Sequence, residues 1–219
     1  MSSHFAIAID GPAASGKSTL AKELAKRLGL VMVNSGAMYR AVTWKLLEDG
    51  VDPEDESAVV EALQGMKISC GVEGLVSTVS IDGFDPGEQL RGEEINGKVS
   101  GVSAIPAVRD RLVGLQREYL ERFDLVMEGR DIGTVVFPDT PYKIYVDADE
   151  SVRAQRRVAI GEVDSVSDRD RTDSERITAP LKVAEGAVVL DTSTHTIESG
   201  VRAAIDILRS QGLEIRETQ

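Results

Sequence analysis

The sequence predicts an α/β protein of three layers, in which a five-stranded parallel sheet is flanked by helices. Short apolar runs alternate with segments of helical periodicity along most of the 219 residues. Each run ends in polar or glycine residues, and the first run leads directly into a glycine-rich turn. Because crossovers between parallel strands are right-handed, we expect the ligand crevice beyond the carboxyl ends of the strands. The runs expected as core strands are residues 5–10, 30–33, 125–128, 142–146 and 187–190.

The turn after the first run has the pattern G-x-x-x-x-G-K-S. A loop that wraps a phosphate turns its backbone N–H groups inward, and glycines relax the steric limits on those dihedral angles. In this motif the lysine reaches the β- and γ-phosphates and the serine hydroxyl ligates Mg²⁺. We therefore expect ATP with Mg²⁺ here, at the start of a helix through residues 20–28. The loop consists of Gly11, Pro12, Ala13, Ala14, Ser15, Gly16, Lys17, Ser18 and Thr19.

Composition excludes several classes of protein. A net charge of −12 argues against a nucleic-acid polymer as partner, because no general basic field attracts one. No apolar stretch approaches the roughly 20 residues that span a bilayer, so we expect no membrane segment. The N-terminal apolar run lacks a basic leader and a cleavage pattern, and the lone Cys70 fits a reducing compartment. We expect a cytoplasmic protein and, from 4% aromatic residues, a monomer.

From about Met66 the sequence changes from helical periodicity to the alternation of apolar and polar residues that is typical of β-strands, interrupted by glycines. Short strands without intervening helices do not fit a doubly wound core. We therefore expect an insert over residues 66–96, with residues 1–65 and 97–219 forming the core. Residues 161–175 are polar and lack apolar periodicity, so composition alone predicts a loop there. Helices are expected over residues 20–28, 36–47, 54–63, 94–103, 106–120, 150–157 and 197–208.

Two arginines follow strand ends at the expected crevice. Arg40 lies early in the helix after the second strand, and Arg130 follows the third strand. The guanidinium fork binds phosphate bidentately and keeps its charge. Each arginine alone fits a surface ion pair equally well. Together, two arginines at one edge of the sheet of an acidic protein indicate a binding site for a second anion, in addition to the nucleotide triphosphate. A phosphotransferase needs such a second site, whereas a nucleotide-dependent switch does not.

At this point the sequence resembles the bacterial cytidylate kinase family, nucleoside-monophosphate kinases with the P-loop kinase fold that act on CMP and dCMP. The resemblance covers most of residues 5–210 and rests on four ordered blocks: residues 11–18, Ser35-Gly-Ala-Met-Tyr-Arg40, Gly129-Arg-Asp-Ile-Gly-Thr-Val-Val-Phe-Pro-Asp139 and Ala179-Pro-Leu181. It implies transfer of the γ-phosphoryl group of MgATP to CMP or dCMP, with both nucleotides as substrates. It also implies that residues 66–96 bind the nucleoside monophosphate and that residues 158–176 form a short lid.

The resemblance also implies roles for individual residues. Ser35, Arg109 and Asp131 contact the cytosine ring, with Ser100 nearby and Tyr39 in the same substrate-binding set. Arg40 and Arg130 hold the CMP phosphate. In the lid, Arg169 and Asp173 meet the ribose and Arg176 meets the phosphates. The catalytic set is Lys17, Arg40, Arg130 and Arg176, with Ser18 as the metal ligand.

Two features depart from the family pattern. Asn34 stands where many relatives have aspartate, and the arm between Arg157 and Arg169 is around ten residues shorter than usual, so we expect a shortened lid. Glu128, at the end of the third strand, fits Mg²⁺ binding through water and an ion pair about equally well. The sequence is also compatible with another acceptor of the phosphoryl group, namely UMP, AMP or a non-nucleotide hydroxyl. A nucleotide-dependent switch, with residues 161–175 as a docking loop, is the alternative from another class.

Overall fold

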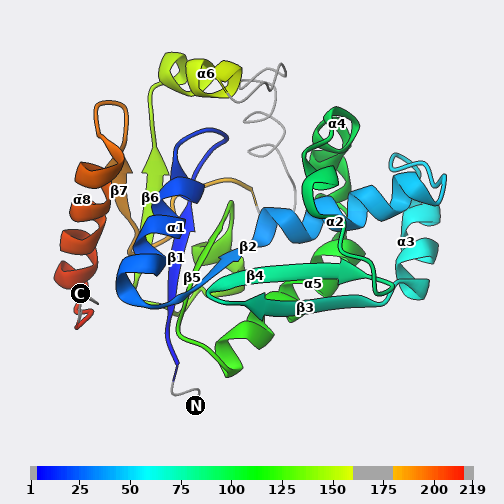
Figure 1. Ribbon diagram of the computed structural model, residues 1–219, viewed down its shortest axis with the longest axis horizontal. Coiled ribbons are helices and arrows are strands. Elements are labelled where there is room, and N and C mark those ends of the chain that lie inside the picture. The colour runs from blue at the N-terminus through cyan, green and yellow to red at the C-terminus, as the bar shows by residue number, and fades with distance from the viewer. Residues whose placement is uncertain (1–3, 160–179, 215–219) are drawn as a thin grey trace.

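The computed structural model describes residues 4–159 and 180–214, and all structural statements concern those residues (Figure 1). One seven-stranded sheet runs through the molecule in the order β3-β4-β2-β5-β1-β6-β7. The strands are β1 Ala6–Asp10, β2 Val31–Asn34, β3 Ile68–Glu73, β4 Val76–Ile81, β5 Leu125–Gly129, β6 Lys143–Asp147 and β7 Val188–Asp191. Strands β2, β5, β1, β6 and β7 are all parallel, which confirms the predicted fold class.

The sheet has two strands more than the five expected. Strands β3 and β4 form an antiparallel hairpin, and β4 continues the sheet beside β2. The junction is short: Met32 pairs with Val76, and the Met32 amide donates to the Leu75 carbonyl oxygen at 2.8 Å. The hairpin satisfies backbone groups at the edge of β2 that would otherwise be unpaired.

The helices lie on both faces of the sheet (Figure 1). Most of them fall within a few residues of the expected ranges. Two short elements, η1 and the π-helical turn η3, have no counterpart in the sequence prediction. The helical segments are α1 Lys17–Leu28, α2 Ser35–Glu48, α3 Glu56–Gly65, η1 Gly87–Arg91, α4 Glu93–Val102, α5 Pro106–Glu118, η2 Tyr119–Glu121, η3 Ile132–Val136, α6 Glu150–Ala159 and α8 Ile197–Ser210.

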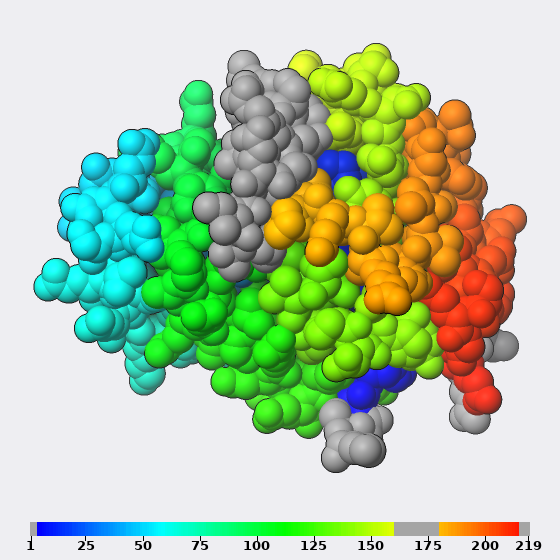
Figure 2. Space-filling view, turned by 180° about the vertical axis from the view of Figure 1, so that it is seen from behind, coloured from blue at the N-terminus to red at the C-terminus, as the bar shows by residue number. Residues whose placement is uncertain are grey.

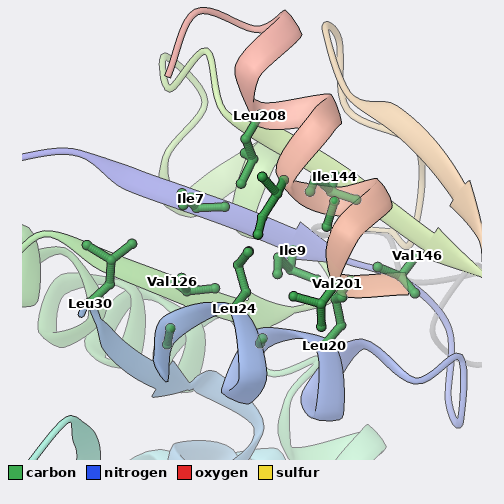
Figure 3. Close-up of a cluster of buried hydrophobic side chains, with 14 of the residues drawn as sticks. Ile7, Ile9, Leu20, Leu24, Leu30, Val126, Ile144, Val146, Val201 and Leu208 are labelled. Carbon is green, nitrogen blue, oxygen red and sulfur yellow. The ribbon is translucent and has the colours of Figure 1, made fainter. Parts of the chain in front are cut away.

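Strand β1 is buried on both faces, as expected of a central parallel strand. Ile7 and Ile9 point to the face covered by α1 and α8, where they meet Leu24 and Leu208 (Figure 3). Ala6 and Ala8 alternate with them and belong to the core on the opposite face. Seen from behind, β7 and the chain before it pack beside α8 (Figure 2).

A third cluster of buried side chains joins α2, α3, α4 and α5 to the β3–β4 hairpin. Leu46, Val102 and Leu112 are fully buried in it. The hairpin is therefore packed against the helices as well as hydrogen-bonded to the sheet. None of the described helices is both long enough and apolar enough to cross a membrane.

Candidate functional site

Most of the predicted site residues that the structure describes line one cleft of about 1700 Å³. Its walls come from the loop after β1, the start of α2, the helix α4, the turn after β5 and the end of α6. Gly11, Pro12 and Ser15 belong to the same loop but do not line the cleft. The predicted residues that line it are Ala13, Ala14, Gly16, Lys17, Ser18, Thr19, Ser35, Tyr39, Arg40, Ser100, Arg109, Arg130 and Asp131.

The loop between β1 and α1 depends on its two glycines. A Cβ atom at Gly11 would lie 2.1 Å from the carbonyl oxygen of Val146 on β6, so no side chain fits. Gly16 caps α1 with a φ of 89°, a left-handed conformation that costs other residues free energy. The loop therefore passes close to β6 and then turns directly into the helix.

Three carbonyl oxygens of this loop accept hydrogen bonds from side chains elsewhere in the chain. The Thr192 hydroxyl donates to Ser15 O at 2.7 Å. Arg153 and Arg156 of α6 donate to Ala13 O and Ala14 O, each at 3.4 Å. Because C=O and N–H of a trans peptide point in opposite directions, the next amide groups are turned the other way. Sequence reasoning missed Arg153 and Thr192, since no local pattern marks their contacts.

The start of α1 brings a lysine and a hydroxyl to the cleft. Lys17 Nζ donates to Pro12 O at 3.0 Å, so the side chain lies along its own loop. Ser18 Oγ donates to Glu128 Oε1 at 2.9 Å, and Glu128 is buried at the end of β5. A hydroxyl beside a carboxylate provides the oxygen ligands that Mg²⁺ prefers. These two side chains therefore fit a magnesium ion.

The described residues contain no group of three or more His, Cys, Asp or Glu side chains able to hold a metal. Mg²⁺ sites of phosphoryl-transfer enzymes commonly use one or two carboxylates together with substrate phosphates and water.

A buried ion pair joins α5 to the turn after β5. Arg109 donates from Nη2 to Asp131 Oδ2, and the two side chains are 3% and 8% exposed. Arg109 also donates to Ser103 O at 3.2 Å and lies over the Tyr39 ring, 5.7 Å from its centroid. The cleft thus has a rigid wall that presents both an acceptor and a donor.

The first turn of α2 carries the next polar groups. Asn34 caps this helix by accepting a hydrogen bond from the Ala37 amide at 3.0 Å. An amide oxygen and a carboxylate oxygen can both do this, so the departure from aspartate keeps the cap. Ser35 Oγ donates to Glu128 O at 2.8 Å. Arg40 Nε donates to Asn96 Oδ1 at 3.4 Å, and Asn96 is a lining residue that the sequence did not reveal.

One buried carboxylate lies beneath the cleft. Asp10 ends β1 and accepts the backbone amides of Ile132 and Gly133, both at 2.7 Å. Burial raises the pKa of Asp10 from 3.8 to about 6, although both amide hydrogen bonds lower it. The sequence marked this residue only as the end of an apolar run.

The comparison with known families agrees with this geometry. The family model described as "Cytidylate kinase" matches residues 7–210. This chain belongs to the cytidylate kinase family. The resemblance seen in the four sequence blocks is therefore confirmed.

Curated relatives named cytidylate kinase match the chain along nearly its whole length. The protein of Mycolicibacterium paratuberculosis is 43% identical over 223 residues, covering 96% of this chain and 98% of the relative. The protein of Caldanaerobacter subterraneus subsp. tengcongensis is 44% identical over 214 residues, covering 93% and 94%. The protein of Chlorobaculum tepidum is 43% identical over 219 residues, covering 92% of each.

Three residues that the family pattern assigns to the substrates lie outside the described residues: Arg169, Asp173 and Arg176. The same holds for the predicted short lid beyond Ala159, which is the last described residue before the gap. The predicted loop over residues 161–175 also falls in that part of the chain. Their roles remain predictions from the sequence.

Proposed function

We propose that this cleft is the active site in which the γ-phosphoryl group of MgATP passes directly to the phosphate of CMP or dCMP. The products are ADP and CDP or dCDP. The observation that carries the proposal is that a single cleft joins the phosphate-binding loop to the buried Arg109–Asp131 pair. Membership of the cytidylate kinase family supports the same reaction.

On the donor side, the loop of residues 11–19 binds the triphosphate of ATP. Its outer carbonyl groups are held by α6 and Thr192, which leaves backbone N–H groups for the phosphates. Lys17 neutralises charge on the β- and γ-phosphates once it exchanges its contact with Pro12 for them. Ser18 and Glu128 would hold Mg²⁺, directly or through water. When bound, Mg²⁺ neutralises charge that builds on the phosphoryl oxygens.

On the acceptor side, Arg109 and Asp131 form hydrogen bonds with the edge of the cytosine ring. The Asp131 carboxylate accepts from the C4 amino group, and Arg109 donates to the ring carbonyl. The pairing pre-organises both groups, because burial and the Ser103 contact fix the guanidinium before substrate arrives. Ser35, Tyr39 and Ser100 complete this wall, with residues 66–96 as the insert that binds the monophosphate.

Two arginines aim the acceptor phosphate. Arg40 and Arg130 line the cleft, and Asn96 contacts the Arg40 guanidinium. An oxygen of the CMP phosphate forms the new bond to the γ-phosphorus while the bond from that phosphorus to the β–γ bridging oxygen breaks. The acceptor oxygen is already ionised, so no general base is needed and electrostatic stabilisation supplies most of the rate. Arg176, in the lid of residues 158–176, closes over the transferring group, and Arg169 and Asp173 hold ribose.

The test is ADP formation from MgATP with CMP, dCMP, UMP and AMP as acceptors. Fast turnover on CMP and dCMP alone supports the assignment of Arg109 and Asp131 to the base. Equal turnover on UMP or AMP overturns that assignment. Isothermal titration separates a kinase from a switch, because only a kinase binds a monophosphate at a second site.

The proposal also covers the setting of the reaction. We place the enzyme in the cytoplasm as a monomer whose partners are its small-molecule substrates. The net charge of −12 disfavours nucleic-acid polymers and anionic membrane surfaces. Light scattering coupled to gel filtration measures the oligomeric state, and a stable dimer would contradict this part of the proposal.

A further inference from the structure

Asp10 connects the two halves of the cleft. It is the last residue of β1, and the next residue, Gly11, opens the phosphate-binding loop. Its carboxylate reaches the neighbouring chain after β5 and accepts two consecutive amides, Ile132 N on Oδ1 and Gly133 N on Oδ2, both at 2.7 Å. Asp10 is only 3% exposed, so water does not compete for these bonds.

The two amides open the π-helical turn η3, and the residues just before them are Arg130 and Asp131. Holding both amides fixes the backbone from which these two side chains enter the cleft. We infer that Asp10 is a positioning residue, which sets the acceptor side of the cleft relative to the phosphate-binding loop. The inference rests on the proposed function, because it assigns the turn to acceptor binding.

The contact requires an ionised carboxylate. Two oxygens accept two N–H groups, and each such charge-assisted bond is stronger than its neutral equivalent. In Asp10→Asn one oxygen is replaced by an NH₂ group, which faces a backbone N–H that it cannot bind. The turn must then shift, while the phosphate-binding loop stays held through its Ala13, Ala14 and Ser15 carbonyl oxygens. The acceptor side therefore moves and the donor loop keeps its place.

The experiment measures both substrates separately in Asp10→Asn. We expect the KM for CMP to rise about tenfold or more, as loss of a charged hydrogen bond implies. The dissociation constant for MgATP, measured by titration, should change less than about threefold. A merely structural role of Asp10 would weaken the binding of CMP and of MgATP alike, or would weaken neither. Either of those results overturns the inference.

The matched control is Asp147→Asn. Asp147 also ends a parallel strand, β6, but among the described residues its carboxylate accepts only the amide of the adjacent Ala148, at 2.8 Å. Both constants should stay within about twofold of the wild-type values. A rise in the KM for CMP equal to that of Asp10→Asn would show that any strand-end carboxylate has this effect, which also overturns the inference.

A second variant approaches the same contact from the turn. In Gly133→Ala the added Cβ would lie 3.2 Å from Asp10 Oδ2, 3.2 Å from Lys143 Cδ and 3.3 Å from Ala184 Cβ. The crowding pushes the amide away from the carboxylate, so the KM for CMP should again rise selectively. This variant decides the matter if Asp10→Asn does not fold, and an unchanged KM for CMP then overturns the inference.

Acidification gives an independent readout. Asp131 and Lys17 are the charged groups whose fields act on Asp10, and the Lys143 ammonium of β6 is bound by the carbonyls of Pro138 and Glu185. Since burial raises the pKa of Asp10 to about 6, the wild-type residue resembles Asn at lower pH. The KM for CMP of Asp10→Asn divided by that of the wild type should therefore fall towards one below about pH 6. A ratio that does not change with pH contradicts the inference.

Failure of the inference is distinguishable from failure of the proposed function. A wild-type enzyme that phosphorylates no monophosphate overturns the proposed function and with it the inference. A wild-type enzyme that is active on CMP, together with an Asp10→Asn variant whose KM for CMP is unchanged, overturns the inference alone.

Discussion

The ion pair between Arg109 and Asp131 makes a quantitative prediction about stability. Its side chains are 3% and 8% exposed, so removal of one partner takes the opposite charge away from a buried charged group. Breaking a buried ion pair in this way lowers the free energy of unfolding by about 3–5 kcal/mol. For a chain of this size, that corresponds to a fall in the melting temperature of roughly 6–20 °C. Arg109→Met and Asp131→Ala should each show this loss in thermal and urea unfolding.

The double variant separates the pair from its surroundings. With both charges removed, no uncompensated charge remains, and methionine fills much of the space of the arginine stem. The combined loss should therefore be smaller than the sum of the single losses by about 2 kcal/mol or more. Arg109 also donates to Ser103 O, so some loss persists in the double variant. Additive losses would refute the reasoning, because they would mean that the two residues do not stabilise each other.

A surface pair provides the control. Arg209 and Asp206 lie 3.4 Å apart on α8, with side chains 50% and 67% exposed. Arg209→Met should lower stability by no more than about 1 kcal/mol, because water and salt screen exposed pairs. The double variant of the buried pair should also lose about a hundredfold in kcat/KM for CMP, since two contacts to the base disappear. Retained kcat/KM in a folded double variant would contradict the assignment to the base.

Three further predictions concern the donor loop and the buried carboxylate. In urea unfolding, Gly50→Ala should lower the free energy of unfolding by ~1 kcal/mol, and Gly11→Ala should lower it several times as much. Of these two positions, only at Gly11 would the added Cβ meet a backbone atom, at 2.1 Å. Equal losses in the two variants would contradict this. Ser18→Ala should lower kcat about 10- to 100-fold and raise the Mg²⁺ concentration needed for half-maximal rate, and an unchanged Mg²⁺ requirement in steady-state assays counts against its role. The pKa of Asp10 is raised from 3.8 to about 6, so its contribution to stability is full below pH 3.8 and is lost as pH rises through about 6. The unfolding free energy of the wild type relative to Asp10→Asn should therefore fall by about 1 kcal/mol between pH 5 and 7, and a constant difference contradicts the shift.

The elements that the sequence predicted well have local causes. Strand β1 is recognisable because both of its faces are buried, which produces an uninterrupted apolar run. The loop after it is recognisable because its glycines are required at fixed spacing. Arg40 and Arg130 could be placed at the cleft because Arg130 directly follows the carboxyl end of β5 and Arg40 lies early in the helix that follows β2.

The features that escaped prediction depend on contacts between distant parts of the chain. The hairpin joins the sheet through the single pair Met32 and Val76, which no periodicity encodes. Thr192 reaches Ser15 across 177 residues of sequence, and Asp10 reaches Ile132 across 122. A threonine after a strand or an aspartate at its end has the same local appearance whether or not it makes such a contact.

The contacts that hold the phosphate-binding loop from outside also link ATP affinity to the orientation of α6. With ATP bound at this loop as proposed, Arg153 and Arg156 contribute to the affinity for ATP only while α6 lies against the loop carbonyls. Thermodynamic linkage is reciprocal, so bound ATP must stabilise that placement of α6 by the same free energy.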